Sequence, residues 1–224
     1  MMECVPGFTI RGSVRVETPL LLAPMEDVTA QPMRRIAKRI ANPGLLFTEF
    51  ISAMAIEHGA VKTLRKMRVH PDEHPLGIQI FGAEPAAMAE AARLAVEMGA
   101  DLVDINMGCW VPKVCKTGAG AALLKDPDIA AQVVRAVVGA VCVPVTIKVR
   151  AGFGSGEFTA PNFVRRMVGE GASMVTLHAR FAKQGHEGSA DWELISRLRE
   201  VIPDVPLVGN GDVRTPKDAH EMIR

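Results

Sequence analysis

Short apolar runs alternate with longer amphipathic stretches along most of the chain. Each apolar run stops at a polar or glycine-containing turn, and the stretch that follows is compatible with a helix. Repeated alternation of this kind predicts a parallel sheet. The predicted strands span residues 20–23, 45–50, 76–81, 102–106, 143–149, 174–178 and 205–210. The predicted helices span residues 32–40, 51–64, 85–98, 127–138, 161–170, 192–201 and 216–224.

The number of strand–helix units decides between two α/β architectures. Seven units are more than an ordinary doubly wound domain needs, and the TIM barrel, with eight, is the better fit. A length of 224 residues suits one such domain. We therefore predict a single TIM (β/α)8-type barrel domain over residues 1–224 that lacks its last βα unit. Residues 8–16 alternate around Arg11-Gly12 and predict a hairpin plugging one end.

Composition narrows the class of protein only slightly. The hydrophobic content of 48% is enough for a large core, and a formal charge of +1 gives no overall attraction to nucleic acid. Any RNA binding must then depend on a local basic surface. No apolar stretch approaches the ~18 residues of a membrane span, and the N-terminus lacks a signal-peptide pattern. We expect a cytoplasmic protein without membrane contact.

The cysteines point to thiol chemistry at one position. Cys4, Cys109, Cys115 and Cys142 stand at irregular spacings, with no CxxC pair and no Cys/His cluster. Neither a metal site nor a disulfide framework is predicted, and the thiols are expected to be reduced. Cys115 and Cys142 are interpreted as structural. A lone cysteine is usually an inert core residue, but Cys109 lies in a glycine-bounded loop after a strand, where function is often placed.

Functional side chains of a barrel gather where the strands end at its C-terminal face. The corresponding positions in this chain carry mostly polar residues and one thiol. They are Ala23-Pro24-Met25-Glu26, Glu49, Gln79, Asn106, Cys109, Lys148, Arg150, His178, Arg180 and Asn210-Gly211-Asp212.

Lys148 is the hardest of these residues to interpret as scaffold. Its strand is otherwise apolar, and a lysine pointing into a barrel needs a partner or an anion. His178 alone is most often a packing residue with a hydrogen bond. Lys148, His178 and Arg180 together predict a mouth that favours an electron-rich or anionic ligand.

The amide side chains suggest what kind of ligand this is. Gln79, Asn106 and Asn210 can each donate and accept hydrogen bonds, as recognition of a flavin or a pyrimidine requires. No GxGxxG sequence follows the first strand, and no Walker A sequence is present. Neither a Rossmann nor a P-loop nucleotide site is therefore supported.

These residues stand in motifs that resemble a known family. From Leu21 to its last residue the chain is similar to the flavin-dependent tRNA-dihydrouridine synthases, most closely the bacterial type. Each motif is weak alone, but seven in order at matching intervals are specific. They are Ala23-Pro24-Met25, Gly77-Ile78-Gln79-Ile80, Asp104-Ile105-Asn106-Met107-Gly108-Cys109, Gly118-Ala119-Gly120-Ala121-Ala122-Leu123-Leu124, Pro144-Val145-Thr146-Ile147-Lys148-Val149-Arg150, Leu177-His178-Ala179-Arg180 and Val208-Gly209-Asn210-Gly211-Asp212.

The resemblance implies an FMN enzyme that reduces uridine in tRNA to 5,6-dihydrouridine, with NADPH as electron source. It implies Cys109 as the general acid, and Asn106 and Arg180 on the substrate side. The residues implied to bind FMN are Pro24, Met25, Glu26, Gln79, Lys148, His178, Asn210, Gly211 and Asp212.

The chemistry of the reaction agrees with these roles. Reduction of the C5=C6 bond needs a hydride at C6, which only the flavin supplies, and a proton at C5, which a protonated thiol can donate. Lys148, Arg180 or His178 would stabilise charge that develops on the uracil carbonyl. The uridine must leave its stack, so basic residues are needed to hold phosphates. The candidates for this are Lys113, Lys116, Arg180 and Lys183.

The chain departs from the family pattern in two places. Trp110 follows Cys109, where the family usually has proline; tryptophan leaves the loop freer, and its ring could stack on a base. The second departure is larger: the family's eighth strand, with its phosphate-binding turn, and its C-terminal helical domain have no counterpart in the sequence.

Two other functions stay open from the sequence. One is a free-pyrimidine flavin oxidoreductase of the dihydroorotate dehydrogenase kind, which shares barrel, FMN and a cysteine acid. The other is an inactive RNA-binding remnant of a tRNA reductase, without flavin.

Overall fold

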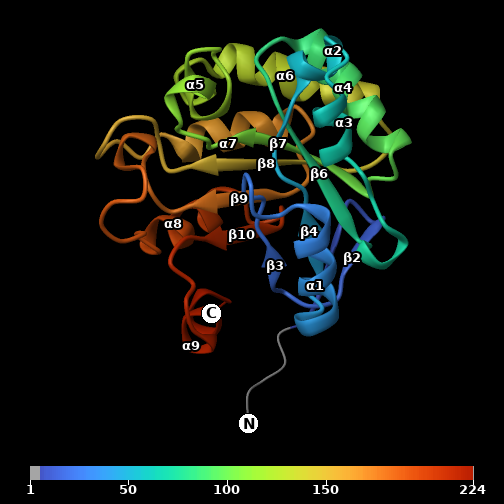
Figure 1. Ribbon diagram of the computed structural model, residues 1–224. Helices are drawn as coiled ribbons and strands as arrows, with labels where there is room; N and C mark the ends of the chain where they lie inside the picture. Colours follow the sequence, from blue (N-terminus) through green and yellow to red (C-terminus); the bar gives the residue numbers. More distant parts are fainter. Residues whose placement is uncertain (1–5, 224) are drawn as a thin grey trace.

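A curled parallel sheet forms the centre of the molecule (Figure 1). The computed structural model describes residues 6–223. The strand order is β10-β9-β8-β7-β6-β4-β3, with β5 beside β6, and the predicted parallel sheet is confirmed. The strands of this sheet are β3 (Leu21–Leu22), β4 (Leu45–Phe47), β5 (Ile51–Ser52), β6 (Leu76–Phe81), β7 (Leu102–Met107), β8 (Val145–Arg150), β9 (Val175–His178) and β10 (Leu207–Asn210).

Helices follow the strands and cover the outer face of the sheet. Figure 1 shows α4, α6 and α7 along this face, and α4 packs on α6, α6 on α7 and α7 on α8. The helices are α1 (Gln31–Ala41), α2 (Ala53–Glu57), α3 (Val61–Lys66), α4 (Pro85–Glu97), α5 (Pro112–Cys115), α6 (Pro127–Ala140), α7 (Ala160–Gly169), α8 (Glu193–Val201) and α9 (Pro216–Ile223). Short 3₁₀ turns are η1 (Pro71–Glu73), η2 (Gly120–Lys125) and η3 (Ala182–Gln184). No helix among residues 6–223 is both long and apolar enough to cross a membrane.

The predicted hairpin is confirmed and lies at the N-terminal end of the sheet. Strands β1 (Phe8–Ile10) and β2 (Val14–Val16) pair antiparallel. Ile10 and Val16 are fully buried and pack with Leu45 and Leu102 in one apolar cluster. The hairpin therefore covers the end of the sheet opposite the candidate residues, which stand at the strands' C-terminal ends.

The predicted helix over residues 51–64 is wrong. The first two of these residues form β5, and the rest are split into α2 and α3 by a turn. Ser52 caps α2 by accepting a hydrogen bond from the Ala55 N–H, and Gly59 breaks the helix with a φ of +66°. A left-handed residue cannot continue an α-helix, and glycine adopts that conformation at little cost.

The sheet is open between its first and last strands. Within residues 6–223, β3 and β10 are the edges of the sheet and do not pair with each other. A cavity of about 440 Å³ lies between them, lined by Leu21, Leu207 and Val208 among others. An eighth strand would occupy this position in a closed barrel. The described residues form a TIM-type half-barrel, and the predicted fold class is confirmed.

Candidate functional site

Strand register brings the candidate side chains together on the concave face. Alternate residues of each strand point inward, and the register pairs Gln79 with Asp104, and Asp104 with Thr146. One step toward the C-terminal ends, Asn106 pairs with Lys148. The last step pairs Arg150 with His178 and His178 with Asn210. The polar residues therefore form successive layers that rise toward the mouth of the half-barrel.

A cavity of about 1150 Å³ opens above these layers. Almost all of the predicted site residues line it, which places the ends of five strands, β3, β7, β8, β9 and β10, around one space. The predicted residues in its wall are Pro24, Met25, Glu26, Asn106, Cys109, Lys148, His178, Arg180, Asn210, Gly211 and Asp212. Arg150, His186 and Trp110 line it as well. Gln79 is fully buried beneath Asn106 and is not part of the wall.

A directional chain of hydrogen bonds leads from Asp104 to the cysteine loop. The buried Asp104 carboxylate accepts from the Thr146 hydroxyl (2.5 Å) and from the Gln79 amide (2.6 Å). Gln79 in turn accepts from Asn106 (2.8 Å). Asn106 Oδ1 accepts from the backbone N–H groups of Gly108 (3.1 Å) and Cys109 (2.9 Å). We name Asp104, Gln79 and Asn106 the amide relay, which fixes the position of the loop.

Cys109 is half-buried in the cavity wall with its proton retained. Burial raises the pKa of the Cys109 thiol, partly opposed by the Val111 backbone N–H and the Arg150 guanidinium. A thiol with a raised pKa stays protonated at neutral pH, where it is an acid rather than a nucleophile. Cys115 donates its thiol proton to the Cys109 carbonyl at 3.4 Å and supports the loop from behind. Cys109, Cys115 and Cys142 are free thiols, and Cys4 lies outside the described residues.

The Lys148 ammonium forms no ion pair with a carboxylate among the described residues. Its Nζ donates to Asn210 Oδ1 at 3.0 Å, its one hydrogen bond within residues 6–223. Burial, with the nearby Arg150 charge, lowers the pKa of Lys148 to about 8. The ammonium is therefore protonated at neutral pH and keeps N–H donors for a ligand.

His178 is a neutral imidazole. Burial, together with the charges of Lys148, Arg150 and Arg180, holds the pKa of His178 far below its usual range. Its Nε2 lies 3.2 Å from the Arg180 guanidinium, which can only donate, so the ring proton is on Nδ1. Gly211 allows β10 to approach this ring, because a Cβ there would lie 2.9 Å from His178 Cδ2, at a φ of +116°.

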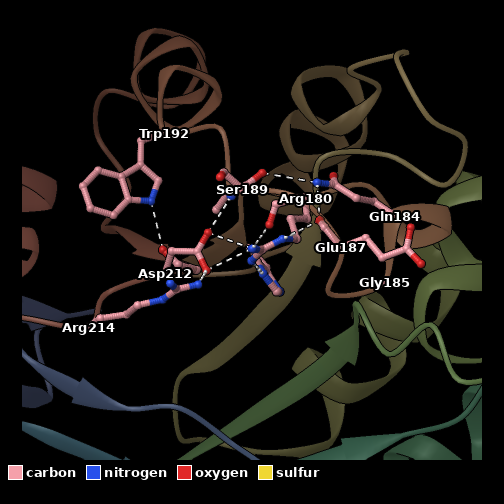
Figure 2. Close-up of polar contacts among 12 residues, drawn as sticks. Arg180, Gln184, Gly185, Glu187, Ser189, Trp192, Asp212 and Arg214 are labelled. Atoms are coloured by element: carbon pink, nitrogen blue, oxygen red, sulfur yellow. Dashed lines mark hydrogen bonds and ion pairs between the residues drawn. The ribbon is translucent and has the colours of Figure 1, made fainter.

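Arg180 is directed at the protein rather than at the open space (Figure 2). Its side chain is 4% exposed and donates to both oxygens of Asp212, at 2.9 and 2.7 Å. It also donates to the carbonyl of Gly188 (2.8 Å). Asp212 accepts further from the Ala190 N–H (2.7 Å) and from Arg214 (3.1 Å). The pair thus joins the loop of residues 185–190 to the end of β10.

Arg150 joins two other loops, a role that its sequence context did not indicate. Its Nε donates to the Gly108 carbonyl (3.0 Å), and its Nη1 donates to the carbonyls of Phe181 (3.0 Å) and Gly185 (2.7 Å). Gly108 precedes Cys109, and Gly185 precedes His186. A strand-end arginine is visible in the sequence, whereas its carbonyl partners depend on how distant loops pack.

The acidic residues at the rim are balanced by a lysine. Glu26, Asp27 and Glu49 lie close together, and the Lys66 ammonium contacts Glu26 (2.5 Å) and Glu49 (3.2 Å). Glu49 also accepts from the Asp27 N–H at 2.9 Å. This network fixes the turn after β3, which carries Pro24 and Met25 along the cavity wall.

Comparison with known proteins shows the family of this chain. The family model described as dihydrouridine synthase matches residues 21–224. The chain belongs to the dihydrouridine synthase family. The match covers the whole sheet and all of the strand ends that line the cavity, so the predicted family is confirmed.

Similar dihydrouridine synthases occur in diverse bacteria. A probable tRNA-dihydrouridine synthase 1 of Synechocystis is 42% identical over 90% of this chain and 56% of its own length. A probable tRNA-dihydrouridine synthase of Rhizobium leguminosarum is 41% identical, over 93% of this chain and 65% of its own. The tRNA-dihydrouridine synthase B of Xanthomonas campestris is 36% identical, over 95% and 64%. The chain therefore spans less than two thirds of each of these relatives.

The fold extends beyond this family. A histamine dehydrogenase structure from Rhizobium superposes with a TM-score of 0.72 at 17% identity, over 97% of this chain and 43% of that one. At this identity the likeness concerns the fold alone.

Proposed function

We propose that this chain carries the catalytic centre of an FMN-dependent reductase that converts uridine to 5,6-dihydrouridine in tRNA, with NADPH as electron source. The observation that carries the proposal is a half-buried, protonated Cys109 facing the same cavity as the Lys148 ammonium and a neutral His178. Membership in the dihydrouridine synthase family supports it. Because tRNA is the substrate, we also propose a cytoplasmic location.

The cavity fits a flavin ring and a pyrimidine together. Its volume of about 1150 Å³ exceeds the roughly 300–1,000 Å³ of typical single-ligand sites. Ala23, Pro24 and Met25 offer an apolar wall, and Lys148 presents unused N–H donors. The residues that would hold FMN are Pro24, Met25, Glu26, Lys148, His178, Asn210, Gly211 and Asp212 in the wall, with Gln79 supporting from beneath.

The side chains divide the remaining work of the reaction. The chemistry that FMN supplies when bound is the hydride for C6, which no side chain can provide. Cys109 donates its proton to C5, and the amide relay holds the loop that carries the thiol. Lys148 and His178 stabilise negative charge developing on the uracil carbonyl. Arg180 acts on the substrate side by shaping the loop of residues 185–190.

Binding of tRNA requires that the uridine be extruded from its stack. Lys113 lines the cavity, and Lys116 and Lys183 stand exposed on the flanking loops. These side chains would contact phosphates, which gives binding a local electrostatic basis despite a net charge of +1.

The test begins with the absorption spectrum of the purified chain, before and after FMN is added. We expect a flavin spectrum that survives desalting. Dihydrouridine formation in unmodified tRNA is then measured with NADPH. Cys109→Ala should lower the rate by about 10²–10⁴-fold, as expected for loss of a general acid. Cys142→Ala is the matched control, because this free thiol is exposed and does not line the cavity.

Other outcomes would favour the other functions. A colourless protein that ignores FMN would refute the proposal and support an RNA-binding remnant. Turnover of free uracil or dihydroorotate without any dependence on tRNA would support a free-pyrimidine oxidoreductase.

A further inference from the structure

Two aromatic rings stand at the cavity rim, one on each flanking loop. Trp110 follows Cys109 and is 37% exposed, and His186 is exposed on the loop after η3. Their ring centroids are 5.9 Å apart at an interplanar angle of 80°. His186 lies in turn 6.2 Å from the buried His178. A line of rings therefore runs from the solvent to the floor of the site.

The edge-to-face arrangement leaves ring faces available. In such a pair, the ring that presents its edge keeps both of its faces uncovered by the partner. Gly185 packs against part of the Trp110 ring, but Trp110 is 37% exposed and His186 is exposed, so both rings keep surface open to solvent. A large exposed aromatic side chain at the mouth of a cavity favours binding over packing.

Arg150 holds both rings in place from below. It donates to the carbonyl of Gly108, two residues before Trp110, and to that of Gly185, directly before His186. A Cβ at Gly185 would already lie 3.4 Å from the Trp110 ring, so the two loops touch at this point. The rings are therefore preorganised by a single guanidinium, which lowers the cost of ordering them when a ligand binds.

The charges around the rings indicate the chemistry of the ligand. Lys113 lies three residues after Trp110, Lys183 lies three residues before His186, and both are exposed. Flat rings on loops that also carry exposed ammonium groups match an unstacked nucleobase and its phosphates. Burial, with the charges of Arg150 and Arg180, lowers the pKa of His186, so its ring is neutral at pH 7 and suited to stacking.

We propose that Trp110 and His186 form a stacking site for the nucleobase next to the target uridine, with Arg150 as the positioning residue of that site. The inference rests on the proposed function, because it takes tRNA as the ligand. Stacking on such a site is tolerant of base identity, since every base has a π-face. It would hold the opened strand while the uridine occupies the cavity.

A binding experiment tests the site without any turnover. Tryptophan fluorescence of the FMN-free chain is followed while single-stranded pentauridylate is added, and again with an abasic pentamer of the same backbone. The second tryptophan, Trp192, is half-buried and donates to the Gly211 carbonyl at 2.9 Å, so Trp110 is the more accessible reporter. We expect quenching by pentauridylate and not by the abasic pentamer. The quenching should be lost in Trp110→Phe, because this variant lacks the indole that reports binding.

Steady-state kinetics test the role in the reaction. Trp110→Ala and His186→Ala should each raise the KM for tRNA about tenfold or more, as expected for the loss of one stacking contact. Trp110→Phe should restore most of the affinity, because it restores a ring. Val111→Ala is the matched control: Val111 lies on the same loop, is 43% exposed and has no ring. Flavin content is measured in each variant, so that the KM values are compared for the flavin-loaded enzyme.

Two results would overturn the stacking site. One is a KM for tRNA in Trp110→Ala equal to that of Val111→Ala while uridine reduction proceeds. The other is equal quenching by the abasic pentamer. A chain that binds pentauridylate by stacking but does not reduce uridine would instead refute the proposed function and support the stacking site.

Discussion

At the scale of single residues, one carboxylate determines how two amides are oriented. Asp104 can only accept hydrogen bonds when ionised, so the Gln79 NH₂ must face it and the Gln79 oxygen must face Asn106. That orientation leaves Asn106 Oδ1 toward the backbone N–H groups of Gly108 and Cys109. The loop that carries the thiol thus depends on a residue below the cavity floor.

Asp104→Asn tests this dependence. An asparagine places its own NH₂ against either the Thr146 hydroxyl or the Gln79 amide, so one donor loses its acceptor. We expect a loss of about 1–3 kcal/mol in the free energy of unfolding, measured by urea denaturation. The rate of Cys109 alkylation should also change. Thr146→Val is the control, because it removes one donor to Asp104 and leaves the amide relay intact. The rate of Cys109 alkylation should be unchanged in this variant. Equal effects of the two substitutions on that rate would contradict the role of the relay.

The charge of Lys148 gives the site a distinctive pH dependence. With a pKa of about 8, the ammonium is present at pH 7 and is lost as the pH rises, well below the ~10.4 of ordinary lysines. We expect FMN affinity to fall about tenfold between pH 7 and 9, measured by flavin fluorescence quenching. Lys148→Met should bind weakly with no such trend. Lys116 is exposed, so Lys116→Met should keep the fall in FMN affinity with rising pH. An FMN affinity of the unaltered chain that does not change with pH would contradict the role of Lys148 as the cation that binds the flavin.

At the scale of elements, the sequence was sufficient wherever local signals agreed. Strand β6 is found at the predicted residues 76–81, because its apolar run has clear turns on both sides. The helix predicted over residues 51–64 is wrong, because the prediction gave more weight to the apolar spacing than to Ser52 and Gly59. Ser52 caps a new helix, and Gly59 forms the turn that ends it. Local pattern alone cannot weigh these opposing signals.

The candidate site was predictable to a similar degree. The residues at the predicted strand ends make up most of the cavity wall, because the topology of a parallel sheet brings those ends together. His186 was not predicted, because a lone histidine in a loop carries no signal of its own. Its place beside Trp110 depends on the carbonyl contacts of Arg150, which link residues far apart in the chain.

A buried ion pair joins α1 to η1. Arg34 and Glu73 are both fully buried, 2.8 Å apart, and Arg34 also donates to the carbonyls of Thr29 (2.8 Å) and Arg68 (2.9 Å). Arg34→Met leaves an uncompensated buried carboxylate, so we expect about 3–5 kcal/mol of destabilisation in urea unfolding. Arg93→Met breaks an exposed pair with Glu90 and should stay within about 0.5 kcal/mol. Similar costs for the two variants would refute this.

At the scale of the whole molecule, the open sheet divides the chain into a centre and two edges. Strands β6, β7 and β8 each have neighbours on both sides, whereas β3 and β10 have one each within residues 6–223. Core strands open only with the global free energy of unfolding, and edges open at lower cost.

Hydrogen exchange should reveal this gradient. Amides of residues 102–107 should exchange at least about tenfold more slowly than those of residues 207–210, followed by mass spectrometry of peptic peptides. Residues 145–150 serve as an internal control for a second central strand. Equal protection at β10 and β7 would mean that another interaction covers the edge.

The position of Arg150 has a thermodynamic consequence. One guanidinium binds the Gly108 carbonyl on the thiol side and the Gly185 carbonyl on the opposite side, so neither loop can shift without weakening the bonds to the other. Ligands on the two sides are then linked: if occupation of the rim raises affinity at the floor, occupation of the floor raises affinity at the rim by the same factor. We expect this coupling to disappear in Arg150→Met, so that each ligand binds as if the other were absent.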